Sequence, residues 1–244
     1  MNFIKLENVS KTYKNLTVLK NVTMEIEKGE FVGILGPSGC GKSTLLTLIS
    51  GLEKISSGHL KNNSTKRKSA FVFQDSCLMP WKNLEQNIAI PLEILNTPQK
   101  EISEKVNKYL QILDLQKFKK HFPRELSGGM KMRASIARAL ITDPEVILMD
   151  EPFAALDQIL RERLADEIYE IYLKKKLTSV FVTHNIAEAV SLCNRIYIFS
   201  AHPGKIIGQI KIEKDKSSIK NYRNSEDFHK NCVKIRTILE NQND

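Results

Sequence analysis

Eight residues, GPSGCGKS at positions 36–43, have the types and spacing needed to hold phosphate groups. They fit the pattern G-x-x-x-x-G-K-[ST], whose glycines let backbone N–H groups turn inward and form an anion-binding nest. An apolar strand precedes them and a helix follows, whose N-terminal dipole is aimed at the same phosphates. This agreement favours a nucleotide site over a plain Gly-rich turn. The implied nucleotide-binding residues are Gly36, Pro37, Ser38, Gly39, Cys40, Gly41, Lys42, Ser43 and Thr44.

Side chains in and near this loop have distinct chemical roles. Lys42 adds positive charge for the β- and γ-phosphates, and the Ser43 hydroxyl is placed to ligate Mg²⁺. The loop and helix amides around Cys40 also favour a thiolate, so we expect a lowered thiol pKa and ATP-protected reactivity there. The competing interpretation is that Cys40 contributes only its backbone N–H.

Two neighbouring carboxylates end a second apolar run, VILMDEP at positions 146–152. Adjacent side chains of a strand point in opposite directions, so the two acids can do different work. We predict that Asp150 ligates Mg²⁺ and that Glu151 is the general base for an attacking water. An acidic strand-to-loop junction is the alternative, and it is common where no phosphate loop lies upstream.

A second anion-binding device precedes the helix expected at 131–140. In LSGGM, positions 126–130, Ser127 can cap the helix while Gly128 and Gly129 expose amide groups. Taken alone, this segment equally fits a plain capped helix. A single nucleotide has no evident need for both devices from one subunit, so we expect the second to complete the site of a partner subunit.

These motifs, in this order, resemble the ATP-binding subunit of an ATP-binding-cassette (ABC) transporter over nearly the full chain. The resemblance implies that Tyr13 stacks on adenine and that Gln74 reaches Mg²⁺ and senses the membrane partner. It implies that His184 contacts the γ-phosphate and that Asp157, in the D-loop Ala155-Leu-Asp157, crosses the dimer. The alternatives are an ordinary strand tyrosine and a structural histidine. Glu151, His184 and Lys42 are then the catalytic residues, and Ser43, Gln74 and Asp150 the metal ligands.

Finer features resemble the nitrate/sulfonate/taurine-type importer ATPases. They are Met130 in place of the usual signature Gln, the LMPW segment at 78–81 and the SAHPG segment at 200–204. His202 stands where that group usually has Arg, and segment 58–69 is shorter and more basic than usual. Trp81, with Leu78, Met79 and Pro80, is a candidate for docking a permease, and a core-packing tryptophan is the competing interpretation.

The elements that must position these residues follow from apolar patterning. We expect an α/β fold: a P-loop NTPase core with an N-terminal antiparallel β part and an inserted α-helical subdomain. Strands are predicted at 3–9, 22–26, 31–35, 70–73, 146–149, 179–182, 195–200 and 205–212, and helices at 43–49, 102–113, 131–140 and 159–173. The ATPase domain should span 1–213, with the helical subdomain at about 76–144, and a linker and short helix at 214–244.

Composition limits the function classes. No stretch approaches the roughly 20 apolar residues that cross a bilayer, and no signal peptide is evident, so we expect a cytosolic protein. The four cysteines are far apart, which argues against a disulfide framework and a zinc site. The net charge of +9 comes from scattered basic runs without interleaved aromatics, so we expect no nucleic-acid partner and a modest bias toward lying near a membrane.

The resemblance implies ATP and Mg²⁺ as ligands and three kinds of partner. They are a second copy in an ATP-sandwich dimer, transmembrane permease subunits and, indirectly, an extracytoplasmic substrate-binding protein. The protein would then lie on the inner face of the cell membrane. Nitrate, sulfonates, taurine, bicarbonate and a vitamin precursor all remain open as substrates. Alternatives are a soluble ABC ATPase of an assembly or cell-division complex and a non-catalytic, nucleotide-gated module.

Overall fold

Two sheets form the framework of the computed structural model, which describes residues 2–64, 69–154, 156–214 and 219–241. An antiparallel sheet has the order β2-β1-β4, and a larger sheet has the order β5-β6-β7-β3-β8-β9. The strands are β1 (Asn2–Tyr13), β2 (Leu16–Glu27), β3 (Phe31–Leu35), β4 (Ser57–Asn62), β5 (Ser69–Val72), β6 (Val146–Asp150), β7 (Thr178–Thr183), β8 (Arg195–Phe199) and β9 (Ile206–Lys211).

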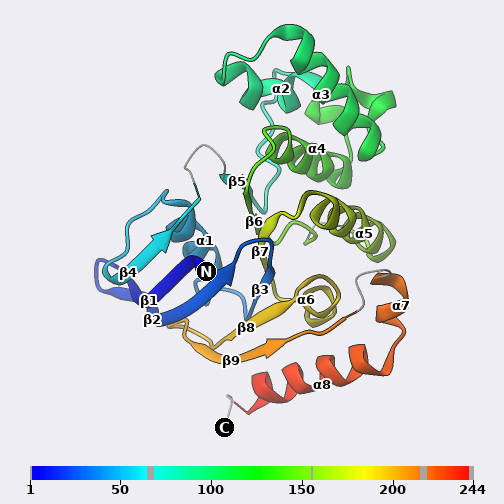
Figure 1. The fold of residues 1–244 in the computed structure, drawn as a ribbon. Helices are drawn as coiled ribbons and strands as arrows, with labels where there is room; N and C mark the ends of the chain where they lie inside the picture. Colours follow the sequence, from blue (N-terminus) through cyan, green and yellow to red (C-terminus); the bar gives the residue numbers. More distant parts are fainter. Residues whose placement is uncertain (1, 65–68, 155, 215–218, 242–244) are drawn as a thin grey trace.

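Helices pack on both faces of the larger sheet and form an arm between β5 and β6 (Figure 1). The α-helices are α1 (Lys42–Ser50), α2 (Leu84–Ile94), α3 (Gln99–Ile112), α4 (Gly128–Leu140), α5 (Gln158–Lys175), α6 (Ile186–Leu192), α7 (Ile219–Arg223) and α8 (Glu226–Glu240). Two short 3₁₀ turns, Gln116–Phe118 and Pro123–Glu125, lead into α4. Among the described residues, no helix has the length and apolar character to span a membrane.

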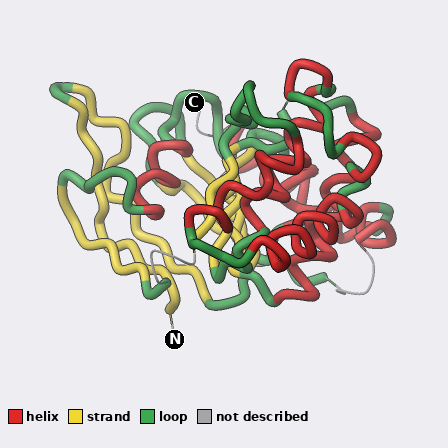
Figure 2. The backbone as a smooth tube through the Cα atoms, turned by 90° about the horizontal axis from the view of Figure 1, so that it is seen from above, coloured by secondary structure: helices red, strands yellow, loops and turns green. Residues whose placement is uncertain are grey.

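The expected fold class is confirmed. The N-terminal antiparallel part is the sheet of β1, β2 and β4, and the helical arm of α2, α3 and α4 is inserted between two strands of the larger sheet. Seen from above, the strands gather on one side of the molecule and most helices on the other (Figure 2). One apolar core lies around α1 between the two sheets, and the other lies between the larger sheet and the remaining helices.

Strand direction decides where the chemistry-bearing residues lie. β5, β6, β7, β3 and β8 are mutually parallel, whereas β9 runs antiparallel to β8. Every residue of β3, β6 and β7 is buried, which explains their continuous apolar runs. The carboxyl ends of parallel strands meet at one sheet edge, where ligands bind in open α/β folds. The residues that follow β5, β6, β7 and β3 therefore converge there.

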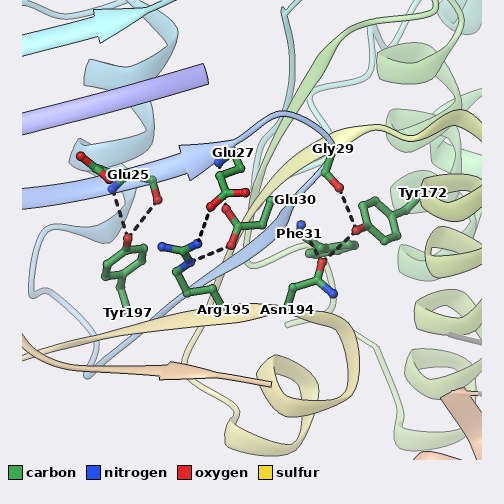
Figure 3. A network of polar contacts seen from close by, with 9 residues as sticks. All are labelled: Glu25, Glu27, Gly29, Glu30, Phe31, Tyr172, Asn194, Arg195 and Tyr197. Atoms are coloured by element: carbon green, nitrogen blue, oxygen red, sulfur yellow. Dashed lines mark hydrogen bonds and ion pairs between the residues drawn. The ribbon is translucent and has the colours of Figure 1, made fainter. Parts of the chain in front are cut away.

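A polar network fixes the opposite, amino-terminal end of β3 (Figure 3). Asn194 Oδ1 accepts the Phe31 N–H at 3.0 Å and lies 2.8 Å from the Tyr172 hydroxyl. Burial, first among its causes, raises the pKa of Tyr172 to about 12, so this hydroxyl stays protonated as a donor. Arg195 binds Glu30 at 2.7 Å and Glu27 at 3.2 Å. The strand that leads into the phosphate loop is thus held by α5, β8 and the end of β2.

Several elements differ from those expected, and the helices α2 and α6 were not among the predicted ones. β4 was not expected because SGHLKN has little apolar pattern; it forms by pairing with β1. The segment at 214–244, predicted as a linker and one short helix, contains a further helix, α7, whose Ile219 and Tyr222 are buried. Residues 215–218 lie outside the described part of the chain.

Candidate functional site

The phosphate loop adopts the backbone that its glycines predict. Gly41 precedes α1 with φ +96°, and a Cβ there would lie 2.8 Å from a Val18 side-chain methyl. No side chain caps the first turn of α1, so its N–H groups remain available to an anion. Pro37, Ser38 and Gly39 are exposed at the tip of the loop. This geometry suits a phosphate group.

Lys42 is held at the mouth of the loop. Its side chain is 4% exposed, and Nζ donates hydrogen bonds to the carbonyl oxygens of Gly36 at 2.9 Å and Pro37 at 2.8 Å. The same Nζ lies 3.7 Å from Glu151 Oε1. The lysine charge therefore lies between the loop and the carboxylate that follows β6.

Asp150 and Ser43 form a candidate magnesium site. Asp150 is the last residue of β6, and burial raises the pKa of its carboxyl, while a hydrogen bond from Ser43 acts in the opposite direction. Asp150 Oδ1 is buried and has no hydrogen-bond partner in the structure. An unpartnered carboxylate oxygen beside a hydroxyl fits a hard divalent cation such as Mg²⁺.

The backbone of Glu151, directly after Asp150, has an unusual conformation. Its φ of +44° lies in the left-handed region, a conformation that costs on the order of 1–3 kcal/mol and clusters at functional sites. Its N–H bonds the carbonyl of Val182 at 3.0 Å, and its Oε2 lies 2.9 Å from His184 Nδ1. The Glu151 side chain is 15% exposed, whereas that of His184 is 54% exposed. A water at this mouth would meet a carboxylate oriented by an imidazole.

Tyr13 ends β1 beside the start of α1. Its hydroxyl donates to Glu53, and Lys11 Nζ lies 4.5 Å from the ring centroid. Burial, then the Glu53 hydrogen bond, raises the pKa of Tyr13, while the Thr44 side chain acts in the opposite direction. The ring is 39% exposed and lies next to the loop, which is compatible with base stacking.

Gln74 follows β5 at the same sheet edge and is exposed. The segment after it is held by a residue that the sequence analysis did not identify. Arg138 of α4 donates at 2.8 Å to the carbonyl oxygens of both Ser76 and Cys77. An arginine within an amphipathic helix resembles any solvated charge, so no sequence signal distinguishes it.

The Ser-Gly-Gly turn does not join the loop within one chain. Ser127 caps α4 as predicted, with its Oγ accepting the Met130 N–H at 3.3 Å. In the described residues, no hydrogen bond or ion pair connects residues 127–129 with residues 36–44. Ser127 and Gly128 are exposed, and Gly129 is buried, where a Cβ would lie 2.3 Å from Leu160 Cδ2.

Asp157 caps α5, and its carboxylate accepts the Leu160 N–H at 3.0 Å. Asp157 is exposed. Ala155, the first residue of the predicted D-loop, lies outside the described residues.

Two sequence-based interpretations are corrected. Cys40 is fully buried, and this burial raises the pKa of its thiol despite the opposing charge of Lys42, so the expected lowering of that pKa is wrong. Trp81 is 71% exposed, so the core-packing interpretation is also wrong. Leu78 packs partly against the core, whereas Met79 and Pro80 are exposed.

Comparison with known proteins places this arrangement in a family. The family model described as ABC transporter matches residues 19–154. The aliphatic sulfonates import ATP-binding protein of Bacillus cereus is 42% identical over 241 residues, covering 95% of this chain and 94% of the relative. The protein of that name from Bacillus subtilis is 46% identical, covering 78% of this chain and 75% of the relative.

Solved structures agree with the sequence relatives. A dimeric structure of a bacterial ABC transporter cassette is 34% identical, has a TM-score of 0.79, and covers 87% of this chain and 100% of its own. A dimeric post-hydrolysis state of that cassette, bound to ADP and Pi, has a TM-score of 0.77, with the same identity and coverage. The chain therefore belongs to the ABC transporter family.

Proposed function

We propose that this protein is the ATP-hydrolysing subunit that energises a membrane importer for small sulfonates. Nitrate and taurine are related candidate substrates. The observation that carries the proposal is 42% identity to an aliphatic sulfonates import ATP-binding protein over 95% of this chain. The convergence of Lys42, Asp150, Glu151 and His184 at one sheet edge supports catalysis and disfavours a non-catalytic module.

ATP binding is assigned to the loop at 36–44, with Lys42 at the β- and γ-phosphates and Tyr13 against adenine. Ser43, Gln74 and Asp150 would hold Mg²⁺, which when bound neutralises charge on the phosphates. The unpartnered Asp150 oxygen supports this assignment. The loop amides need little rearrangement, because α1 already presents an uncapped first turn.

Glu151 is the proposed general base. In this role its carboxylate accepts a proton from water as the water oxygen attacks the γ-phosphorus in line with the leaving oxygen. His184 orients Glu151 and contacts the γ-phosphate, and its distance of 2.9 Å from Glu151 supports this pairing. The chemistry requires positioning and electrostatic stabilisation rather than a covalent intermediate.

A second copy is proposed to complete each nucleotide site with Ser127, Gly128, Gly129 and Asp157. Three observations support this dimer. The turn at 127–129 is separate from the loop within one chain, and a similar cassette is described as dimeric. In addition, Ile159, two residues after Asp157, is 83% exposed, so an apolar side chain beside the proposed interface is available to a partner.

Permease subunits are proposed to dock where the helical arm meets the larger sheet. A cavity of about 420 Å³ there is lined mainly by apolar side chains, including Phe71, Phe73, Met79, Ile90, Ile94 and Leu95. Ile94 is 74% exposed and the nearby Trp81 is 71% exposed. This docking would hold the protein on the cytoplasmic face of the membrane, and an extracytoplasmic substrate-binding protein would act through the permease. The proposed unit is an ATPase domain at 1–213, with a helical subdomain at about 76–144 and a C-terminal segment at 214–244.

The substitution Glu151→Gln tests both the proposed ATP hydrolysis and the proposed role in import. We expect it to retain ATP binding and to slow hydrolysis by about a hundredfold or more, because a positioned general base contributes roughly that factor. Lys42→Ala is the control that should lose ATP affinity. In Bacillus subtilis lacking its own relative, the wild-type chain should restore growth on an alkanesulfonate as sole sulfur source, and Glu151→Gln should not. Normal hydrolysis by Glu151→Gln would refute the base assignment. An active wild-type ATPase that fails to restore growth would count against sulfonate import.

A further inference from the structure

A partly buried ion pair links the helix after Asp157 to the helix after His184. Arg161, in the first turn of α5, places its Nε 3.5 Å from Glu188 Oε1 in α6. The Glu188 side chain is 11% exposed and that of Arg161 is 28% exposed. The two helices are in contact and lie to the right of the larger sheet in Figure 1. Neither residue has a role in the assignments above.

Glu188 fixes the chain on both sides of His184. Its Oε2 accepts a hydrogen bond from Thr183 Oγ1 at 2.6 Å. Its N–H donates to the Asn185 side-chain oxygen at 3.2 Å, and the Asn185 N–H donates to Thr183 Oγ1 at 3.0 Å. The residues before and after His184 both bind Glu188. The backbone that carries the imidazole is therefore held in place on both sides.

Arg161 fixes the other end of the link. Its guanidinium donates to the carbonyl oxygen of Leu156 at 3.0 Å, directly before Asp157. In the same helical turn, Leu160 packs against Gly129 so closely that a Cβ there would overlap it. The first turn of α5 thus contacts both segments that are assigned to the partner's nucleotide site.

The link also borders the catalytic carboxylate. A small cavity of about 30 Å³, close to the volume of one water molecule, is lined by Glu151, Arg161, Thr183, His184 and Glu188, together with Ala154. Burial raises the pKa of Glu188, and Thr183 and Arg161 act in the opposite direction. Removing Arg161 leaves the largely buried Glu188 carboxylate without a compensating charge. The ion pair is therefore anchored at both ends, by the Leu156 carbonyl oxygen at Arg161 and by the Thr183 hydroxyl at Glu188.

We propose that Arg161 and Glu188 are positioning residues that couple the Leu156–Asp157 turn to His184. Movement of this turn against a second copy then changes the placement of His184 beside Glu151, so that hydrolysis proceeds when the partner is seated. This inference rests on the proposed roles of His184 and Asp157. One ion pair then couples movement at the proposed dimer interface to the position of His184 beside the Glu151 carboxylate.

Steady-state kinetics of Arg161→Met, Glu188→Gln and the double variant test the coupling. We expect kcat for ATP hydrolysis to fall about tenfold or more, because misplacing a catalytic group by an ångström can cost about a hundredfold. KM for ATP, and ATP-dependent dimer formation in the Glu151→Gln background, should stay within about twofold. The double variant should be no slower than the slower single variant, since both substitutions break one link.

Arg163→Met is the matched control. Arg163 lies on the same helix, but its side chain is 58% exposed and pairs at the surface with Glu167 and Asp114. It should leave kcat and KM unchanged. Thr183→Val, which removes the hydroxyl that holds Glu188, should reproduce the kcat loss if Arg161→Met does not fold.

Two results would overturn the coupling. One is a folded Arg161→Met or Glu188→Gln with kcat within about twofold of wild type. The other is a double variant whose loss is the product of the two single losses. His184→Ala separates this failure from a failure of the proposed site: if His184→Ala is itself active, the role of His184 is wrong, whereas an inactive His184→Ala beside active link variants refutes the link alone.

Discussion

At the scale of single residues, the catalytic carboxylate lies between groups of different chemistry. Glu151 approaches Lys42 at 3.7 Å on one side and His184 at 2.9 Å on the other. Its backbone is left-handed, and the neighbouring Asp150 keeps a carboxylate oxygen without a hydrogen-bond partner, which suits a metal ion. Two adjacent acids therefore have separate environments, which allows one to bind metal and the other to accept a proton.

Thiol chemistry at the phosphate loop is a residue-scale prediction. Cys40 is buried with a raised pKa, so it stays a neutral thiol at neutral pH, whereas Cys77 is exposed. We expect a maleimide to label Cys77 first. Cys40 should react more slowly, because its burial shields the sulfur from the reagent and favours the neutral thiol.

Peptide mass spectrometry of the labelled protein, with and without ATP, measures both rates. Cys77→Ser is the control that should remove the fast phase. Rapid labelling of Cys40 that ATP suppresses would instead restore the reactive-thiolate hypothesis.

Residues of the site differ in how far the sequence predicts them. Ser127 was predicted as a helix cap because hydroxyl-to-amide capping is a local interaction, and the structure confirms it. The raised pKa of Cys40 depends on packing by distant segments, which residue spacing does not encode. The same holds for Arg138 and for the pair of Arg161 and Glu188, whose partners come from other elements.

At the scale of elements, the buried parallel strands place the site residues at their carboxyl ends, and the helices that follow these strands reach the molecular surface. Their continuous apolar runs made β3, β6 and β7 predictable. β4 depends on pairing with β1 and was not predicted. The C-terminal helix α8 was predicted from its apolar spacing, but its packing on β8, β9 and α6 required the structure.

The packing of α8 gives an element-scale prediction. Ile235 is fully buried in this helix, whereas Val233, two residues earlier, is 58% exposed. We expect Ile235→Ala to lower the free energy of unfolding by about 2–5 kcal/mol, because it leaves a cavity in a packed core. Val233→Ala should change it by less than about 0.5 kcal/mol.

Urea unfolding followed by circular dichroism measures both variants. Equal, small effects would mean that α8 is a detachable tail. A large effect confined to Ile235→Ala would mean that α8 belongs to the same cooperative unit as the larger sheet.

At the scale of the whole molecule, the proposed function requires two copies to share two nucleotides. Each copy carries a phosphate loop and, separate from it, the exposed residues Ser127 and Gly128 and an exposed apolar Ile159. Such an arrangement is self-complementary, since the Ser-Gly-Gly turn of each copy can face the phosphate loop of the other. Nucleotide binding and association are then thermodynamically linked, and stability should report on both.

Thermal unfolding of the Glu151→Gln variant tests this linkage. With ATP and Mg²⁺ at about 100 times the dissociation constant, ligand binding contributes about 2.7 kcal/mol. This corresponds to a rise in Tm of roughly 5–10 °C for a chain of this size. If binding also joins two copies, Tm with ATP should rise further with protein concentration, because dimerisation removes folded monomer by mass action. Tm without nucleotide should not depend on concentration, and Lys42→Ala should show neither rise. A Tm that increases with ATP by the same amount at every protein concentration would mean that each copy binds nucleotide alone, and the shared site would have to be abandoned.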